Sequence, residues 1–374
     1  MGWNRVIGQR RVKDLLRRTL ASKKVAHAYL FFGGEGIGKD AAAIEFARAL
    51  NCTVDSVDPC GECPSCKKIE ILQHPNLKLI FPLPVGKNEK SGDNPTEVLS
   101  QDQITVVQEQ LRLKAENPYH RISIPKSNFI KINSVRDLRR DAAMSAFEGG
   151  KKVFVLSNAE TMNAEASNSL LKTLEEPSSD SVFILTASQK EQLLETIISR
   201  CQLVQFDPLS EGEIREALMG RQNAEAEQAA LVARLARGSY SAAREMLSVD
   251  MVAQRQEVVQ FLRFVLGSQK IPLATDIERI GFSGDRSAVE RWLKLLEVWL
   301  RDALVLREHG EKELLNIDHI KDLKSFNQKF PRADLVAALD SVEQSVALVG
   351  KNVYLPLVLT SLAIDLKRSL SSPS

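Results

Sequence analysis

The chain has 374 residues, more than a single hydrophobic core usually holds, so its length predicts two or three domains. With 44% hydrophobic and 26% charged residues, it has the composition of a folded soluble protein. Its net charge of only +2 excludes a globally basic protein that wraps nucleic acid. It has no run of about 18 apolar residues, and the N-terminus MGWNRVIGQRR lacks the apolar stretch of a secretory signal, so we expect it in the cytoplasm.

Short apolar runs alternate with helical patterns over residues 1–207. The first is AHAYLFFGG at residues 26–34, which predicts a strand that ends in glycines, and Ala and Phe follow at helical spacing over residues 40–50. Further apolar runs lie at residues 77–81, 129–132, 153–156, 182–186 and 203–206. Strands that alternate with helices predict an α/β fold, in which helices cover both faces of a parallel sheet.

Residues 82–118 differ from this pattern, because they begin with Pro, Gly, Lys and Asn and continue as a polar helix. Ser100 and Gln103 have the spacing of a capping box. A narrow apolar stripe follows, made of Ile104, Val107 and Leu111. We interpret this segment as an insertion at the surface, and its sequence indicates no task for it.

After residue 207 the pattern is helical to the end of the chain. Ser210 and Glu213 form a second capping-box pattern, and we expect a small helical lid over residues 208–249. Residues 250–374 predict an all-α domain with a final apolar helix at residues 355–366. A second amphipathic helix of this domain is marked by Trp292, Leu295, Leu296, Trp299 and Ala303.

Residues 33–40 read GGEGIGKD and match the GxxxxGK pattern of a phosphate-binding loop between a strand and a helix. Gly33, Gly36 and Gly38 let backbone N–H groups converge on phosphate oxygens, and Lys39 adds a positive charge at the helix N-terminus. A chance glycine-rich turn gives the same letters, but seldom between a strand and a helix.

The residue after this lysine is Asp40, where a phosphate loop has the Ser or Thr whose hydroxyl ligates magnesium. A carboxylate about 4 Å from a phosphate charge costs on the order of 4 kcal/mol at an effective dielectric constant of about 20. Unless Asp40 holds the metal itself, we expect ATP or ADP to bind this chain weakly or not at all.

A second defect follows the run KKVFVL, where the strand of an ATPase ends in acids that hold magnesium and orient the attacking water. This chain has Ser157 and Asn158 there, and we assign Glu160 to the following turn. Two independent defects in one site predict that the chain does not hydrolyse ATP by itself.

Arg200 stands in TIISRCQ, just before the last apolar run of the predicted sheet. A guanidinium suits a transferring phosphoryl group, because its planar donors meet two oxygens at once. The alternative is an arginine paired with an acid at a domain surface, and the sequence does not separate the two. A ruined phosphate site together with an intact arginine indicates a chain that acts on a neighbour's nucleotide.

Four of the five cysteines, Cys52, Cys60, Cys63 and Cys66, form a Cx7CxxCxxC pattern. In a reducing compartment this spacing favours a metal over disulfides. Four thiolates suit a structural zinc ion, since they leave no coordination position open. An iron–sulfur cluster uses the same ligands, but no redox partner is indicated. We assign Cys201 to a small buried position beside the arginine.

Together these segments resemble the clamp-loader branch of the AAA+ proteins over nearly the whole chain. The shared motifs occur in family order and are VIGQ at residues 6–9, AHAYLF at 26–31, the cysteine pattern, NSLLKTLEEP at 168–177 and SRC at 199–201. Motor subunits of that branch have Ser or Thr in place of Asp40 and acids near Ser157 and Asn158. The chain is therefore more similar to the non-hydrolysing subunits of the branch.

This resemblance implies an AAA+ module over residues 1–207, a lid over 208–249 and a helical collar over 250–374 that joins subunits into a ring. It implies that Arg200 is a trans-acting arginine finger for ATP in an adjacent motor subunit. Val6 and Ile7 would line an adenine pocket if a nucleotide enters. The implied partners are the gamma or tau and delta subunits of the bacterial DNA polymerase III clamp loader, primed DNA, and the sliding clamp at most indirectly.

Two helices bear on these implied contacts. In the lid, ARGSYSAAREML resembles the segment with a nucleotide-sensing arginine, but Ser241 falls at that place and Arg244 follows three residues later. The helix SVRDLRRDAAM carries Arg136, Arg139 and Arg140, and similar helices in clamp loaders face the DNA backbone. The alternative for these arginines is a solvated helix face balanced by acids.

Three functions fit the sequence. The first is a non-hydrolysing interaction subunit of the clamp loader, acting in DNA replication. The second is an active ATPase of the gamma or tau type, which GxxxxGK supports and Asp40 opposes. The third is a stand-alone AAA+ remodeller, which co-purification with loader subunits separates from the first. No paired catalytic carboxylates of a polymerase are visible, so we do not expect the polymerase activity of the holoenzyme to reside here.

Overall fold

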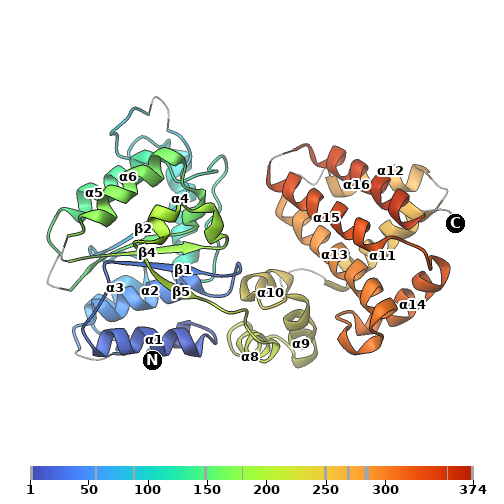
Figure 1. The fold of residues 1–374 in the computed structure, drawn as a ribbon, viewed down its shortest axis with the longest axis horizontal. Coiled ribbons are helices and arrows are strands. Elements are labelled where there is room, and N and C mark those ends of the chain that lie inside the picture. Colours follow the sequence, from blue (N-terminus) through green and yellow to red (C-terminus); the bar gives the residue numbers. More distant parts are fainter. Residues whose placement is uncertain are drawn as a thin grey trace. The chain divides into compact units, whose positions relative to one another are not determined.

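A computed structural model describes residues 3–54, 57–86, 89–146, 150–178, 180–247, 251–267, 270–281, 286–351 and 353–371. The chain forms two compact units, residues 1–245 and 246–374 (Figure 1). The domain boundary expected at residues 249 and 250 lies outside the described residues.

The first unit is built on a five-stranded sheet in the order β2-β3-β4-β1-β5, in which every pair of neighbouring strands is parallel. The strands are β1 (Ala28–Phe32), β2 (Leu77–Ile80), β3 (Lys152–Leu156), β4 (Ser181–Ala187) and β5 (Gln202–Gln205). In the centre, Leu30 of β1 lies between Leu185 of β4 and Leu203 of β5. The predicted α/β fold with a parallel sheet is confirmed.

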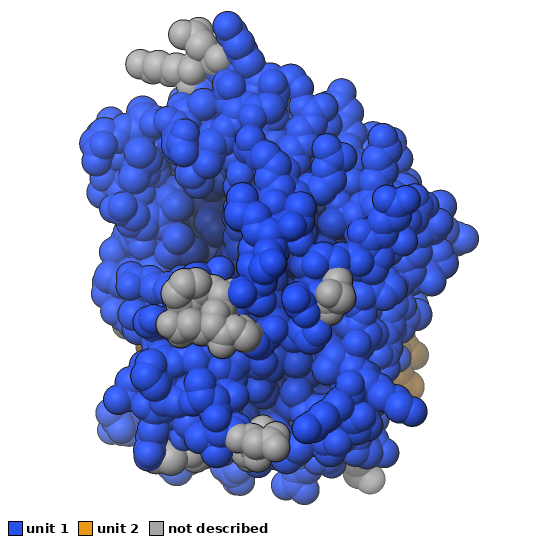
Figure 2. All heavy atoms as spheres, turned by 90° about the vertical axis from the view of Figure 1, so that its left-hand side faces the viewer, with its two compact units in different colours: residues 1–245 blue, residues 246–374 orange. Residues whose placement is uncertain are grey.

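Helices cover both faces of the sheet, because parallel neighbours need long crossover connections (Figure 1). One face carries α1 (Arg10–Ala21), α2 (Lys39–Leu50) and α3 (Pro64–Glu70), and the other carries α5 (Ile132–Ala142) and α6 (Ala164–Glu175). Buried side chains of α5 and α6 pack with those of the central strands into one core. Figure 2 shows the first unit from the side of α3 and α5, and this face is hollowed near its centre.

One predicted strand is wrong. Residues 129–132 contribute only an isolated bridge between Ile130 and Met162, and α5 already begins at Ile132. Ile130 is fully buried in the core beside the sheet. The apolar run therefore reflects burial and not strand pairing, since the two give the same pattern over so few residues.

The insertion holds a helix, α4 (Gln101–Glu116), which begins at the predicted capping box of Ser100 and Gln103. Its apolar stripe packs on a small core of its own, made of Phe81, Leu83, Leu99, Val107 and Ile124. Residues 87 and 88 of the insertion lie outside the described residues. The insertion is therefore a packed element and not an extended loop.

Three helices follow the sheet, α8 (Glu211–Gln222), α9 (Ala226–Leu235) and α10 (Tyr240–Leu247). The capping box predicted at Ser210 and Glu213 is present at the start of α8. These helices occupy the segment in which the lid was expected.

The second unit is all helical, as predicted. Its helices are α11 (Met251–Leu266), α12 (Lys270–Gly281), α13 (Arg286–Glu308), α14 (Ile320–Lys329), α15 (Leu335–Gly350) and α16 (Leu355–Leu370). The predicted stripe of α13 is buried, with Trp292 and Trp299 at most 5% exposed. Among the described residues, no helix is both long and apolar enough to cross a membrane.

Candidate nucleotide and metal sites

The phosphate loop joins β1 to α2 and carries its lysine at the first position of the helix. Gly36 and Gly38 have φ angles of +72° and +105°, a region that favours glycine. Lys39 is buried, and its Nζ donates hydrogen bonds to the carbonyl oxygens of Gly33 at 2.7 Å and Gly34 at 2.5 Å. Burial lowers the pKa of Lys39, while the nearby Asp40 carboxylate opposes this change. A third hydrogen bond of 3.2 Å goes to Ser188 Oγ after β4, so all three donors of the ammonium have partners within the chain.

Asp40 is the centre of a hydrogen-bonded network at the carboxyl ends of β3 and β4. Its Oδ1 accepts from Thr186 Oγ1 at 2.7 Å, and its Oδ2 accepts from Ser157 Oγ at 3.0 Å. Oδ2 also forms an ion pair of 2.7 Å with Nζ of Lys114 in α4, whose side chain is only 3% exposed. A metal ion at Oδ2 would compete with this ammonium for the same oxygen.

Burial disfavours the charged form of Asp40, but the Lys114 ammonium and the hydroxyls of Thr186 and Ser157 outweigh it. Together they hold the pKa of Asp40 below its ordinary value. The lowered pKa favours the ionised carboxylate, which accepts hydrogen bonds from Lys114, Ser157 and Thr186 in the folded chain.

The end of β3 offers no acid to a metal ion. Ser157 donates to Asp40, and Asn158 has a left-handed φ of 54°. Glu160 lies in the next turn, as predicted, where its Oε1 accepts from the backbone N–H of Ser188 at 2.8 Å. The two side chains at the strand end are both neutral.

Val6 and Ile7 are buried, with 2% and 6% of their surface exposed. The backbone N–H of Ile7 donates to the hydroxyl of Tyr119 at 2.7 Å. The lid lies close by, because Ser241 Oγ donates to the carbonyl oxygen of Tyr119 at 2.8 Å. Arg244 lies one turn further along α10 and is partly exposed.

The four predicted cysteines come together. Their sulfur atoms all lie within 4.8 Å of one another, and Cys60 Sγ lies 3.9 Å from Cys66 Sγ. Four sulfurs at 2.3 Å from one zinc ion would lie about 3.8 Å apart, so the spacing suits a tetrahedral site. Residues 55 and 56 of the loop lie outside the described residues. These cysteines could hold a metal ion.

Local hydrogen bonds prepare some of these thiols for a metal. Burial opposes ionisation of Cys63, but backbone N–H groups of Thr53 and Cys66 help to lower its pKa to about 6. Burial raises the pKa of Cys66 to about 12, and the side chain of Arg48 interacts with it. Binding of a divalent metal would release the protons that remain.

Arg200 follows the short helix α7 (Glu195–Ile198), and 36% of its side chain is exposed. Its Nη2 donates to Oε1 of Glu175 at 2.7 Å, and its Nη1 donates to the carbonyl oxygen of Thr196 at 2.9 Å. In the chain by itself, the arginine is thus paired at the surface. Cys201, next to it, packs against the core, and burial raises its pKa to about 12.

The arginines expected to face DNA lie on α5, with Arg139 and Arg140 exposed and Arg136 partly exposed. The acids of the same helix turn toward the sheet, where Asp137 and Asp141 both pair with Lys78 of β2. Arg140 shares Asp137 at 3.1 Å. The two acids therefore do not balance the three arginines of α5 alone, because Lys78 pairs with both acids.

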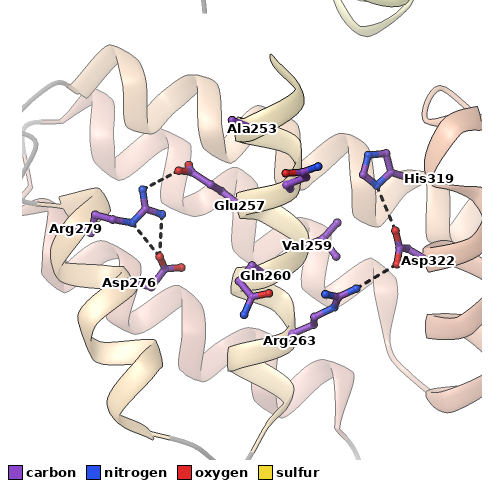
Figure 3. A pocket seen from close by; sticks show the side chains of 10 residues that line it. Ala253, Glu257, Val259, Gln260, Arg263, Asp276, Arg279, His319 and Asp322 are labelled. Carbon is purple, nitrogen blue, oxygen red and sulfur yellow. Dashed lines mark hydrogen bonds and ion pairs between the residues drawn. The ribbon is translucent and has the colours of Figure 1, made fainter. Parts of the chain in front are cut away.

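The second unit contains a cavity of about 630 Å³ beside α11 and α12 (Figure 3). Arg279 pairs there with Glu257 and Asp276 at 2.8 Å. Asp322 pairs with Arg263 at 3.3 Å and with His319 at 3.4 Å. None of the predicted site residues lines this cavity, and all six ionisable side chains that line it take part in these contacts.

The sequence did not predict three residues that complete the phosphate site, namely Lys114, Tyr119 and Thr186. A signal for Lys114 exists, because it continues the stripe of Val107 and Leu111 at helical spacing. A lysine at a core-facing position needs a buried acid, which here is Asp40. No comparable local signal marks Tyr119.

The first unit has a parallel sheet, a strand–loop–helix phosphate site and a four-cysteine cluster, and the second unit is helical. These features are those of a P-loop protein of the AAA+ type. A family model described as DNA polymerase III, delta subunit, matches residues 8–210, more than half of the chain. The chain therefore belongs to the DNA polymerase III delta subunit family.

Several curated proteins are similar to this chain. DNA polymerase III subunit delta' of Bacillus subtilis (strain 168) is 29% identical over 340 residues, 90% of this chain and 86% of that protein. The delta' subunit of Pseudomonas aeruginosa is 32% identical over 249 residues, 65% of this chain and 62% of that protein. DNA polymerase III subunit tau of Bacillus subtilis is 30% identical over 219 residues, 58% of this chain and 30% of that protein. The chain is thus similar to a delta' subunit along most of its length.

The Asp40 network predicts a pH dependence of stability. Because the folded-state pKa of Asp40 lies below its unfolded value, the network stabilises the fold above the unfolded pKa of about 4 and loses this contribution as the pH falls through the folded-state pKa. We expect Asp40→Asn to cost about 3–5 kcal/mol at neutral pH, because it leaves Lys114 unpaired.

Urea unfolding of both proteins at neutral pH and in acid measures this effect, and the difference between them should shrink in acid. Glu97→Gln, at an exposed acid of the insertion, is the control and should be nearly neutral. A difference that stays constant with pH would show that ionisation of Asp40 does not stabilise the fold.

Proposed function

We propose that the chain is a non-hydrolysing subunit of the bacterial DNA polymerase III clamp loader, which supplies Arg200 to the ATP site of a neighbouring motor subunit. In this proposal it acts while the sliding clamp is loaded onto primed DNA in replication. The gamma or tau and delta subunits are its partners, and contact with the clamp is at most indirect. Residues 1–207, 208–249 and 250–374 serve as AAA+ module, lid and collar.

The observation that carries the proposal is the contrast between the chain's own phosphate site and its arginine. Asp40 is paired with Lys114, and the two residues directly after β3 are the neutral Ser157 and Asn158, so the positions that hold magnesium in an ATPase carry no free acid. Arg200 forms one ion pair, with Glu175, and the side chain of Glu175 is 48% exposed. An exposed pair of this kind contributes only about 0.2–1 kcal/mol, so a phosphoryl group can replace the carboxylate.

The alternative is an active ATPase of the gamma or tau type, and the similarity to a tau subunit favours it. An active ATPase needs a metal ion between the loop and the end of β3. In this chain the oxygen of Asp40 at that place binds Ser157 and Lys114. Magnesium-dependent ATP turnover by the purified chain alone would favour the alternative.

The role of Arg200 is tested in a loader reconstituted with its other subunits. Arg200→Ala should lower clamp- and DNA-stimulated ATP turnover at the adjoining motor site by about a hundredfold or more, since arginine fingers contribute about 10³–10⁵ in rate. Glu175→Gln releases the arginine from its surface pair but keeps it, so turnover should be unchanged or higher.

The matched control is Arg215→Ala, at an exposed arginine of α8. Gel filtration must show equal assembly of all three variants. Unchanged turnover in Arg200→Ala would leave the chain as a scaffold only.

We assign zinc to the four-cysteine cluster, with a structural role, because four thiolates fill its coordination sphere. Elemental analysis should find one zinc ion per chain in the wild type and none in Cys63→Ser, which should also be less stable. Cys201→Ser is the control and should keep its zinc. A wild-type chain purified without zinc, yet equally stable, would contradict the assignment.

Arg136, Arg139 and Arg140 are assigned to contacts with the DNA backbone. Replacement of Arg139 and Arg140 by Ala should weaken binding of the loader to primed DNA equally for all sequences. The slope of log affinity against log salt should become shallower by about 1 for each phosphate that an arginine no longer neutralises. The same measurement on Arg215→Ala is the reference, and equal slopes would show that α5 does not contact DNA.

A further inference from the structure

The end of the insertion lies directly on the phosphate loop. Lys114, in the last turn of α4, pairs with Asp40 at 2.7 Å. Tyr119 approaches Gly38, and Arg121 pairs with Glu35 of the loop at 2.5 Å. Residues 114–121, which we call the plug segment, thus contact the loop at three places.

Lys114 brings a positive charge to the place where a metal ion would be held. Its ammonium donates to Asp40 Oδ2 at 2.7 Å and to the carbonyl oxygen of His120 at 2.8 Å. Ser157 donates to the same oxygen of Asp40. Asp40 and Ser157 stand at the two positions from which a P-loop ATPase ligates magnesium. A divalent ion cannot share this place with the ammonium, because the two cations repel each other in a partly buried site.

Tyr119 covers the start of α2. A Cβ atom added to Gly38, the residue before this helix, would lie only 2.7 Å from the Tyr119 hydroxyl. The ring is buried, and its hydroxyl accepts from the N–H of Ile7 at 2.7 Å. Phosphate binds at helix N-termini through the free N–H groups of the first turn, so a side chain packed there competes with it.

The lid closes on the same segment. The N–H groups of Tyr240 and Ser241 donate to the carbonyl oxygen of Gly36 at 3.0 and 3.4 Å. The Tyr240 ring packs edge-on against Tyr119 with 4.9 Å between ring centroids, and Ser241 Oγ donates to the carbonyl oxygen of Tyr119. The phosphate loop, the lid and the plug segment therefore all contact one another.

We propose that the plug segment is an internal substitute for magnesium and nucleotide. The Lys114 ammonium places a single positive charge where the metal would lie, and Tyr119 covers the loop and is the surface on which the lid packs. The phosphate loop and the lid are thereby kept in one closed arrangement by the insertion itself. This role is independent of Arg200 and goes beyond the loss of catalytic acids, since the site is filled as well as inactive.

The proposal separates two causes of weak nucleotide binding, the Asp40 charge and the plug. Calorimetric titration of the full chain with magnesium and ATP compares the wild type, Asp40→Ser and the double variant Asp40→Ser with Lys114→Met. The double variant restores a hydroxyl and leaves no buried charge unpaired. We expect it to bind at least about tenfold more tightly than Asp40→Ser, which should gain little.

Addition of Lys39→Ala to the double variant should remove the gain in affinity. This loss would show that the nucleotide binds at the phosphate loop. Equal affinities of Asp40→Ser and the double variant, with both folded by circular dichroism, would overturn the proposal.

Hydrogen exchange provides a measurement on proteins with the original ion pair intact. Tyr119→Ala should raise the exchange rates of the Tyr240 and Ser241 amides, because it removes the surface that holds the lid. Tyr354→Ala, at an exposed tyrosine of the second unit, is the control and should leave them unchanged. Unchanged lid exchange in Tyr119→Ala, or slower exchange of the loop amides when magnesium and ATP are added to the wild type, would contradict the plug.

Discussion

The ion pair between Asp40 and Lys114 is the contact on which the arrangement of the first unit depends. It joins the start of α2 to the insertion, and the hydroxyls of Ser157 and Thr186 add the ends of β3 and β4. Removing one partner of a buried pair costs about 3–5 kcal/mol, so each charge requires the other. The acid that follows the lysine of the phosphate loop and the lysine on the core-facing stripe of α4 are thus the two partners of one ion pair.

Under the proposed function, this pair also explains how a phosphate loop persists without metal chemistry. Gly36 and Gly38 have the left-handed φ angles of such a loop, and Lys39 donates hydrogen bonds to the carbonyl oxygens of Gly33 and Gly34. Every charged group at the loop then has an internal partner. Arg200 differs, because its one carboxylate partner is exposed and exchangeable. Under the proposed function, the chemistry of the chain is therefore directed outward, to a neighbour's nucleotide.

Much of the fold follows from local patterns in the sequence. Both capping boxes and the stripe of α13 were predicted at the correct residues, because they depend on neighbours within one helix. The strand predicted at residues 129–132 is wrong, since a short buried run has the same sequence pattern as a strand. The cysteine cluster was predictable because its ligands are close in the chain. The contact of Asp40 with Lys114 was not predictable, because 74 residues separate them and the stripe that marks Lys114 as buried does not say which acid it meets.

A crystal structure of the full chain grown with magnesium and ATP tests most directly whether Lys114 and Tyr119 fill the phosphate site. We expect Lys114 Nζ within hydrogen-bond distance of the Asp40 carboxylate, the Tyr119 ring against Gly38, and no nucleotide on the loop. Phosphates bound at Gly36 to Lys39, with a metal ion on Asp40 and Lys114 turned away, would contradict this expectation.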